Sequence, residues 1–200
     1  MTPRAVVFDI GGVLVDWKPH LAWLEELGTI HAVSAFMERV DFKTRNARAD
    51  GGARFADLAS EIDEPEDARR LEAYVSLYTR TVKDRIEGTW DILDRLKAAG
   101  IEVHAITNWS AETWPEGLKV QPRLAKVFGV TVVSGEEGVM KPDARIFHVL
   151  CARAGLEPSE CVFIDDGPHN VEGAKASGMD GIHFTGVEAL EESLRERGLL

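Results

Sequence analysis

The fold of this chain is decided near its start by the stretch AVVFDIGGVLV, residues 5–15. Residues 5–8 are all apolar, which is typical of a strand that helices cover on both faces of a parallel sheet. Gly11 and Gly12 then allow a tight turn of the backbone. Asp9 stands before this turn, and a carboxylate at the end of a buried strand is costly unless it is paired or binds a metal. The stretch therefore predicts a parallel sheet whose first strand ends in a functional carboxylate, with a structural Asp that caps the turn as the alternative.

Strand-like and helix-like segments alternate through the later part of the chain. The hydrophobic pattern predicts strands at 102–107, 130–134, 161–164 and 181–184, and helices at 89–100, 142–155, 170–177 and 187–197. Such alternation with short connections is typical of an α/β fold, a doubly wound parallel sheet in three layers with helices on both faces. Thr89 is expected to cap the first of these helices, and Pro142 to begin the second.

The segment 17–82 has a different character. Apolar residues such as Leu24 and Leu27 recur there at helical spacing, and no strand pattern interrupts them. We therefore expect an α/β catalytic core formed by residues 1–16 and 83–200. The segment between them should be a small all-helical cap, inserted after the first strand.

The composition is that of a folded globular protein. The 200 residues include 34 Asp and Glu against 23 Lys and Arg, which gives a net charge of −11. Nucleic acid binding needs a basic face, so it is not expected. The apolar run at 5–15 is too short for a membrane span. It contains a carboxylate, and Asp16 and Trp17 follow it where small residues should mark a cleavage site, so we expect no signal peptide. Cys151 and Cys161 have no ligand-like spacing, so we expect a reducing, cytoplasmic location, while the oligomeric state stays open.

Chemically capable side chains follow the predicted strands in four places. They are Asp9, the pair Thr107 and Asn108, Lys141, and the pair Asp165 and Asp166. Ligands of open α/β sheets bind beyond the carboxyl ends of the strands, so all four clusters should meet at one edge. Taken singly, each cluster has an ordinary alternative, such as a polar turn, a solvated lysine or an acidic helix N-terminus.

The adjacent carboxylates of Asp165 and Asp166 repel each other unless a cation neutralises them. Hard oxygen ligands beside a phosphate site favour Mg²⁺. Asn170, four residues further on, could orient the acidic pair. The hydroxyl of Thr107, the amide of Asn108 and nearby backbone N–H groups could hold phosphate oxygens. The clusters together predict a site for Mg²⁺ and a small phosphate-bearing substrate.

The order and spacing of these clusters resemble the four motifs of the haloacid dehalogenase superfamily, over essentially the whole chain. The resemblance includes the Asp-x-x-Gly-Val-Leu opening, the Thr-Asn strand end, the Lys-Pro pair and the Asp-Asp-x-x-x-Asn ending. The predicted insertion matches the position of that superfamily's small α-helical cap. The pieces MKPDARIF at 140–147 and FIDD at 163–166 are similar to the branch that holds sugar-phosphate phosphatases and the phosphatase domain of soluble epoxide hydrolase.

The resemblance implies a Mg²⁺-dependent hydrolase, a phosphatase of small phosphate esters. Asp9 would attack phosphorus and form an aspartyl-phosphate, which is a form of covalent catalysis. Mg²⁺ would contact Asp9, the backbone carbonyl of Gly11 and Asp166. Asp165 would be a further ligand or an outer carboxylate, and Asn170 would lie behind it.

The resemblance also assigns the phosphate side of the site. Thr107, Asn108 and Lys141 would hold the phosphoryl oxygens and offset the charge that develops in the transition state. Trp109, which directly follows Asn108, is the best candidate among the tryptophans for contact with the substrate. Core and cap are expected to open and close around that substrate.

The chain departs from the superfamily's phosphatase pattern at Gly11. These phosphatases usually carry an Asp there, which protonates the leaving group and then activates water, a contribution of about 10²–10⁴-fold. Three interpretations stay open. The protein could be a phosphatase in which water or a cap residue such as His20 moves the proton, a 2-haloacid dehalogenase, or a phosphate-binding protein with little turnover. Retention of Asp165 and Asp166 weighs against the dehalogenase, because that branch needs no metal.

Overall fold

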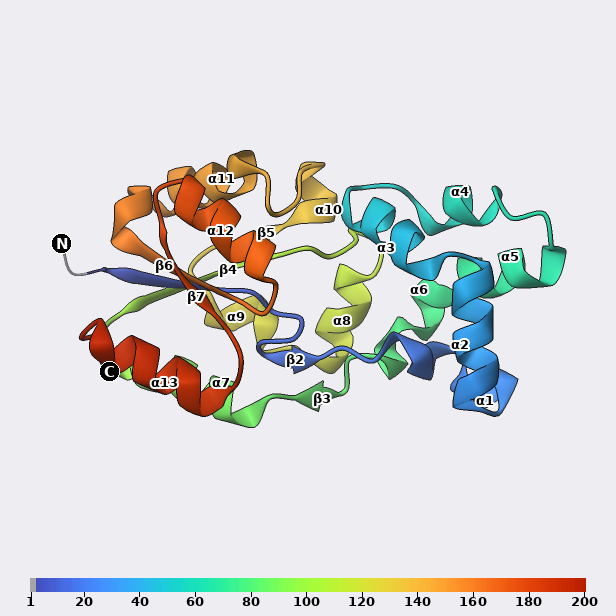
Figure 1. Ribbon diagram of the computed structural model, residues 1–200, viewed down its shortest axis with the longest axis horizontal. Helices are drawn as coiled ribbons and strands as arrows, with labels where there is room; N and C mark the ends of the chain where they lie inside the picture. Colours follow the sequence, from blue (N-terminus) through green and yellow to red (C-terminus); the bar gives the residue numbers. More distant parts are fainter. Residues whose placement is uncertain (1–2) are drawn as a thin grey trace.

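The computed structural model describes residues 3–200, and a five-stranded parallel sheet forms the middle layer of its α/β core (Figure 1). The strands are β1 (Ala5–Phe8), β4 (Glu102–Thr107), β5 (Thr131–Val133), β6 (Cys161–Asp165) and β7 (Asp180–His183), in the spatial order β5-β4-β1-β6-β7. β1 is central, and its Phe8 stands beside Ala105 of β4 and Ile164 of β6. The predicted core strands are all present, and the predicted doubly wound α/β fold is confirmed.

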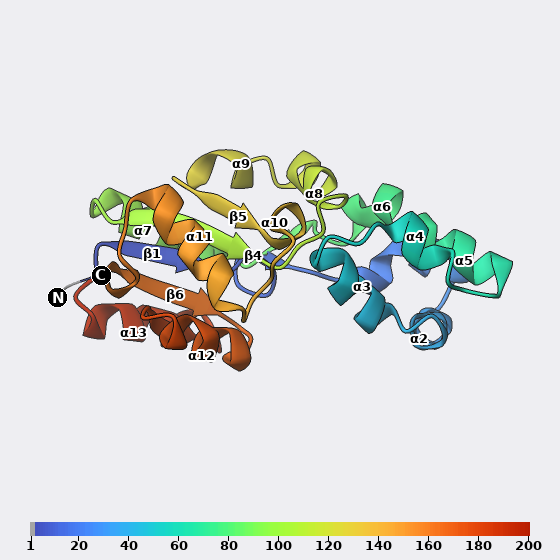
Figure 2. The same ribbon diagram turned by 90° about the horizontal axis from the view of Figure 1, so that it is seen from above.

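Helices cover both faces of the sheet. The main core helices are α7 (Glu87–Ala98), α11 (Ala144–Ala154), α12 (Pro168–Ala176) and α13 (Val187–Glu196). Successive side chains of a strand point to opposite faces, so Val6 and Phe8 pack with α7 and α13, whereas Ala5 and Val7 pack on the face covered by α11 and α12. Figure 2 shows β1 within the sheet, with helices on both sides of it. All four side chains of β1 are fully buried, which explains why this strand carries no polar residue.

Three of the predicted helix starts are wrong, and that of α12 lies at Pro168 rather than at Asn170. α7 begins at Glu87 rather than at Thr89. Thr89 is buried inside the first turn, and its hydroxyl has no hydrogen-bond partner among residues 3–200. α11 begins after Asp143 rather than at Pro142. The Asp143 carboxylate accepts the backbone N–H of Arg145 at 2.9 Å and so caps the helix there.

Short elements that the sequence pattern does not predict complete the core. They are the helices α8 (Trp114–Val120), α9 (Leu124–Val127), α10 (Ser134–Glu137) and η3 (Pro158–Glu160), and the strands β2 (Val15–Asp16) and β3 (Asp84–Arg85). β2 and β3 pair antiparallel where the chain leaves the core and returns to it. Trp90 of α7 stabilises this pair of segments, because its indole N–H donates to the carbonyl of Leu14 at 3.0 Å. Each of these elements is too short to show a clear hydrophobic period.

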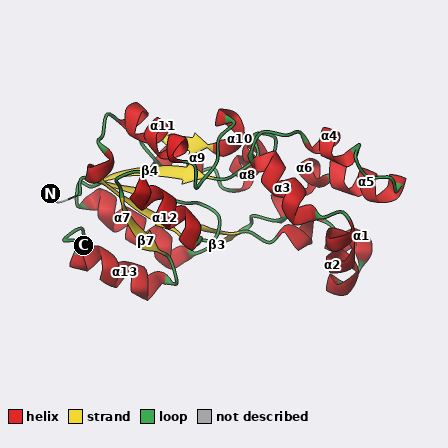
Figure 3. Cartoon of the chain, turned by 45° about the horizontal axis from the view of Figure 1, so that its top comes forward, coloured by secondary structure: helices red, strands yellow, loops and turns green. Residues whose placement is uncertain are grey.

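The regular elements within residues 19–80 are all helices, and they lie beside the sheet layers rather than over them (Figure 3). They are η1 (Pro19–Ala22), α1 (Leu24–Leu27), α2 (Ile30–Arg39), α3 (Phe42–Asp50), α4 (Phe55–Ala59), α5 (Pro65–Glu72), α6 (Tyr74–Leu77) and η2 (Tyr78–Arg80). Their shared core is aromatic: Trp23 stacks on Tyr74, with ring centroids 5.0 Å apart, and meets Phe36 edge-on at 4.9 Å. The fold therefore includes a helical cap, and its limits at residues 17 and 82 stay a prediction.

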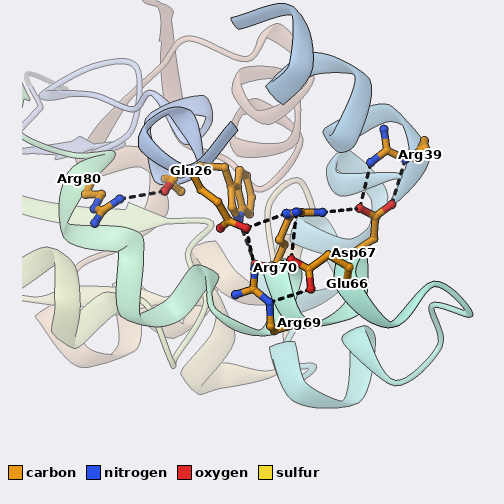
Figure 4. Close-up of polar contacts among 9 residues, drawn as sticks. Glu26, Arg39, Glu66, Asp67, Arg69, Arg70 and Arg80 are labelled. Atoms are coloured by element: carbon orange, nitrogen blue, oxygen red, sulfur yellow. Dashed lines mark hydrogen bonds and ion pairs between the residues drawn. The ribbon is translucent and has the colours of Figure 1, made fainter. Parts of the chain in front are cut away.

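An ion-pair network lies on the outside of the cap and links three of its helices (Figure 4). Arg70 of α5 contacts Glu26 of α1 at 2.9 Å and Asp67 of its own helix at 3.3 Å. Arg39 of α2 donates two hydrogen bonds of 2.9 Å to the same Asp67 carboxylate. Asp67 is the one buried member of this network. Ion pairs whose partners are largely exposed add little to stability, so we infer that the buried aromatic cluster is the main source of the cap's stability.

The cap touches the core at the end of α3. The carbonyl of Asp50 accepts the hydroxyl of Ser134 at 2.6 Å, and the backbone N–H of Phe55 donates to the carboxylate of Glu112 at 2.6 Å. Ser134 directly follows β5, so these contacts hold the cap against the carboxyl edge of the sheet. None of the helices between residues 3 and 200 is long and apolar enough to cross a membrane.

Candidate active site

The carboxyl ends of β1, β4 and β6 lie side by side, and side chains that follow them surround one pocket between the sheet edge and the cap. The pocket has a volume of about 440 Å³. It is bordered by Asp9, Gly11, Gly12, Val15, Asp16, Trp17, Asn46, Asp50, Tyr78, Val82, Thr107, Asn108, Trp109, Thr113 and Asp166. Residues from three of the four predicted clusters therefore border the same space. Lys141, the fourth cluster, and Asp165 are buried behind its wall.

The buried ammonium of Lys141 connects two of the carboxylates. Its Nζ lies 2.6 Å from Oδ2 of Asp165 and 2.9 Å from Oδ1 of Asp9, and it donates to the carbonyl of Ile106 at 3.1 Å. Desolvation lowers the pKa of Lys141, but the charges of Asp9 and Asp165 outweigh this and raise the pKa above its ordinary value. A positive charge is therefore fixed beside Asp9.

The amide of Asn108 fixes the backbone of Lys141. Its Oδ1 accepts the Lys141 backbone N–H at 2.9 Å, and its Nδ2 donates to the Lys141 carbonyl at 3.1 Å. The sequence analysis expects Asn108 to hold phosphoryl oxygens, yet both ends of its amide are engaged with the lysine. Thr107 is buried at the end of β4 and borders the pocket, so its hydroxyl and the strand-end backbone are better placed for that task.

Asp165 is fully buried, and both of its oxygens are engaged. Oδ2 accepts the Lys141 ammonium, whereas Oδ1 accepts the backbone N–H of Gly167 at 2.7 Å and Nδ2 of Asn170 at 2.9 Å. Asn170 therefore reaches the acidic pair through Asp165. Asp165 thus has no free oxygen to offer, and Asp166 is the member of the pair that borders the pocket.

Asp9 lies directly after β1, where it borders the pocket. Among the described residues, the hydrogen bonds to its carboxylate all fall on Oδ1, which accepts the backbone N–H of Ile10 at 2.7 Å and the Lys141 ammonium. Burial, together with the charge of Asp165, raises the pKa of Asp9 to about 8, although Lys141 acts in the opposite direction. An ionised Asp9 therefore needs more positive charge than Lys141 alone supplies.

Asp9, Asp165 and Asp166 form an acidic cluster that is suited to a cation. One oxygen from each carboxylate lies within 4.8 Å of the others. Burial and the charge of Asp165 raise the pKa of Asp166 as well. Three carboxylates against one buried ammonium leave an excess of negative charge, and a set of oxygen ligands fits Mg²⁺. The residues present therefore fit the metal that the sequence predicts.

The two glycines after Asp9 differ in what they permit. Gly12 has a φ of +73°, and a Cβ there would lie 2.3 Å from Oδ2 of Asp166. Glycine at this position is what allows Asp166 to approach the turn. A Cβ at Gly11 would meet no atom within 4 Å. There is room for a side chain at Gly11, so steric crowding does not explain why this chain lacks a carboxylate there.

Trp109 connects the core wall of the pocket to the cap. It borders the pocket but is only 5% exposed, and its indole N–H has no hydrogen-bond partner in the part of the chain that the structure describes. Its ring packs against Tyr78 of the cap at 5.5 Å and against Trp114 at 5.1 Å between centroids. Most of the Trp109 side chain therefore supports the wall, and any contact with a substrate would be limited to its small exposed part.

The sequence analysis misses the cap side chains that border the pocket, Asn46, Asp50 and Tyr78. Their helical pattern indicates which face is apolar, but not which polar side chain meets the core. Two glycines that follow Asp50 are the single local signal that could have drawn attention to it. His20, which the sequence analysis considers for proton transfer, is not among the residues that border the pocket.

The chain is similar to known hydrolases. Residues 3–178 match the model of the haloacid dehalogenase-like hydrolases. Phosphoglycolate phosphatase from Pseudomonas putida is 30% identical over 193 residues, which covers 92% of this chain and 70% of that protein. Flavin mononucleotide hydrolase 1 from Arabidopsis thaliana is 32% identical over 114 residues, 57% of this chain. The chain spans 46% of that hydrolase and 18% of another relative, acyl-CoA dehydrogenase family member 10 of Mus musculus.

Two solved structures share the fold. A haloacid dehalogenase family enzyme from Bacteroides thetaiotaomicron, in complex with magnesium and inorganic phosphate, aligns with a TM-score of 0.66 and 19% identity over 90% of this chain and 93% of that chain. The 2-haloacid dehalogenase from Pseudomonas syringae aligns with a TM-score of 0.64 and 20% identity over 97% and 99%. The family match spans most of the sequence, and the chain belongs to the haloacid dehalogenase-like hydrolases.

Proposed function

We propose that the protein is a Mg²⁺-dependent phosphatase that hydrolyses small phosphate esters through an aspartyl-phosphate on Asp9. The observation that carries the proposal is the setting of Asp9, whose carboxylate borders the pocket, contacts Lys141 and belongs to an acidic cluster suited to a cation. The similarity to a phosphoglycolate phosphatase over 92% of the chain supports phosphate-ester hydrolysis.

The contacts of the core residues give each of them a part in this reaction. Oδ2 of Asp9, which accepts no hydrogen bond among the described residues, would attack phosphorus. Lys141, which contacts Oδ1, favours the ionised form of Asp9 and would offset negative charge in the transition state. Thr107 and the backbone at the end of β4 would hold phosphoryl oxygens.

Asp9 and Asp166 would hold Mg²⁺, with the backbone carbonyl of Gly11 as the further ligand that the family resemblance implies. When bound, the ion supplies electrostatic stabilisation to the phosphoryl group. Asp165 suits the role of an outer carboxylate better than that of a direct ligand, because its oxygens already accept three hydrogen bonds. It would orient Lys141 and balance the charge of the ammonium.

Release of inorganic phosphate tests the proposal. The panel would contain sugar phosphates, acyl phosphates and p-nitrophenyl phosphate, each with Mg²⁺ and with EDTA. We expect turnover that EDTA and Asp9→Asn both abolish and that Asp57→Asn, which removes an exposed cap carboxylate, leaves intact. Turnover that survives Asp9→Asn would contradict the role of Asp9. No turnover across the panel would favour a phosphate-binding protein.

A 2-haloacid dehalogenase is the second candidate, and Gly11 is the observation that favours it. A halide leaves without a proton, so that reaction would need no acid at this position. The acidic cluster points the other way, because carbon–halogen cleavage by Asp9 would need no cation. Halide release from 2-chloropropionate, measured with and without EDTA, separates the two candidates. Halide release without metal, and no phosphate release, would replace the phosphatase proposal.

A further inference from the structure

The proposed reaction includes the transfer of a proton to the leaving group, and no residue has been assigned to this step so far. Gly11 cannot perform it. The ionisable side chains that border the pocket are Asp9, Asp16, Asp50, Tyr78 and Asp166. Asp9 and Asp166 already have other parts in the reaction, so three groups remain to be compared.

Charge and burial separate these three groups. Asp16 belongs to the core and is about half exposed, and its carboxylate already pairs with the ammonium of Lys18 at 2.9 Å. Burial raises the pKa of Tyr78 well above its ordinary value, so its phenol holds its proton too tightly to give it up near neutral pH. Asp50 has no ion pair among residues 3–200, and it is the one carboxylate on the cap side of the pocket without another assignment.

Asp50 is held firmly in place. It is the last residue of α3, and its Oδ2 accepts Nδ2 of Asn46, one helical turn earlier, at 2.9 Å. Its backbone carbonyl accepts the hydroxyl of Ser134 at 2.6 Å, and the same Ser134 oxygen accepts the backbone N–H of Trp109 at 3.0 Å. The end of α3 is thereby tied to the loops after β4 and β5. These loops also carry the wall of the pocket, so Asp50 is positioned relative to the reacting groups.

The surroundings of Asp50 give it two accessible protonation states near neutral pH. Burial raises the pKa of Asp50 to about 7, while the backbone N–H of Ser110 and the charge of Lys141 act in the opposite direction. Tyr74 and Tyr78 also face the carboxylate, and its charge contributes to their raised pKa values, so both phenols are neutral neighbours. A group that donates a proton and then takes one back works best with a pKa near the working pH.

We propose that Asp50 of the cap is the general acid and base of this enzyme and performs the proton transfer that Gly11 cannot; the inference rests on the proposed phosphatase function. In the first step, Asp9 forms its bond to phosphorus while the ester P–O bond breaks, and the neutral Asp50 gives its proton to the departing alkoxide. In the second step, the Asp50 carboxylate takes a proton from water. The water oxygen bonds to phosphorus as the bond between phosphorus and the Asp9 oxygen breaks. This step yields inorganic phosphate and the free Asp9 carboxylate.

The dependence on the leaving group tests this assignment. An alkoxide needs a proton to leave, whereas p-nitrophenolate does not. Asp50→Asn should therefore lower kcat on glycerol phosphate by about 10²–10⁴-fold. It should lower the formation of p-nitrophenol in the first turnover by less than about tenfold, which also shows that the variant is folded. Asp57→Asn on the same cap is the matched control and should change neither rate.

The pH profile and a rescue variant complete the test. In the wild type, kcat on glycerol phosphate should fall as the pH rises through the pKa of Asp50, and this limb should disappear in Asp50→Asn. Gly11→Asp, which has room for a side chain, should restore turnover on glycerol phosphate in the Asp50→Asn background. Equal losses of rate on both substrates, or no loss of rate on glycerol phosphate, would overturn the role of Asp50. Either result would leave the phosphatase proposal intact. Wild-type turnover that does not depend on Asp9 would overturn the phosphatase proposal itself.

Discussion

At the scale of the residue, the side chains of the site differ in how many of their polar atoms already form hydrogen bonds within the protein. Asp165 and Asn108 are saturated by contacts with Lys141 and its neighbours, so they position the lysine. Asp9 and Asp166 border the pocket, and the proposed reaction assigns the chemistry to them. Asp165 and its neighbour Asp166 look equivalent in the sequence, but we propose different roles for them because the first is buried and the second is not.

A first prediction at this scale is that Gly12→Ala weakens both the binding of Mg²⁺ and the stability of the fold. A Cβ at this position would collide with the Asp166 carboxylate, and the residue would have to keep a left-handed backbone. We expect the affinity for Mg²⁺ to fall by about 10- to 100-fold, the usual effect of a disturbed metal environment. The free energy of unfolding should fall by about 1–2 kcal/mol, because of the backbone strain. Isothermal titration with Mg²⁺ and urea unfolding measure the two effects.

Gly28→Ala separates these two causes. Gly28 has a similar φ of +76°, but a Cβ there would meet no atom within 4 Å. This variant should lose a similar amount of stability and keep the full affinity for Mg²⁺. An unchanged affinity in Gly12→Ala would show that Asp166 does not need its present position to bind the ion.

At the scale of the element, the topology brings the clusters together. β1 lies between β4 and β6, so the residues that follow these three strands are neighbours although they are far apart in the sequence. β1 and β6 were predictable because they are short and almost entirely apolar, and the polar residues of β4 and β7 stand mainly at the strand ends. The helix starts at Thr89 and Pro142 were not, because burial and a stronger cap at Asp143 decided them. Local preferences for helix ends are weak compared with tertiary packing.

A second prediction belongs to the loops between these elements. Asn108, which follows β4, holds both backbone groups of Lys141 in the loop before α11. Asn108→Ala should lower the free energy of unfolding by about 1–3 kcal/mol, the usual effect of unpaired polar groups. It should also lower phosphate release, because the ammonium is no longer fixed beside Asp9. Urea unfolding and the phosphate assay measure these effects.

Ser60→Ala is the control for Asn108→Ala. It also removes a hydrogen bond from a side chain to a backbone carbonyl, that of Asp57, but it lies on the exposed surface of the cap. It should change neither stability by a comparable amount nor activity. Full activity in Asn108→Ala would mean that Lys141 keeps its place without this clamp.

At the scale of the whole molecule, the pocket exists only because the cap meets the core. The core side of the site was predictable, since Asp9, Thr107, Lys141 and Asp166 each follow a recognisable strand or motif. The cap side was not, because Asp50 reaches the pocket only through the packing of α3 against the loops near Ser134. A helical period in the sequence carries no information about such a contact between two distant parts of the chain.

The most direct test of the central claim is to trap the covalent intermediate. The enzyme would be mixed with Mg²⁺ and acyl phosphate, quenched in acid and digested, and the peptide that contains Asp9 would be analysed by mass spectrometry. We predict a phosphoryl group on Asp9 that requires Mg²⁺ and is absent from Asp9→Asn. Phosphate release with no covalent phosphate on this peptide, in either the wild type or the slowly hydrolysing Asp50→Asn variant, would contradict the aspartyl-phosphate mechanism.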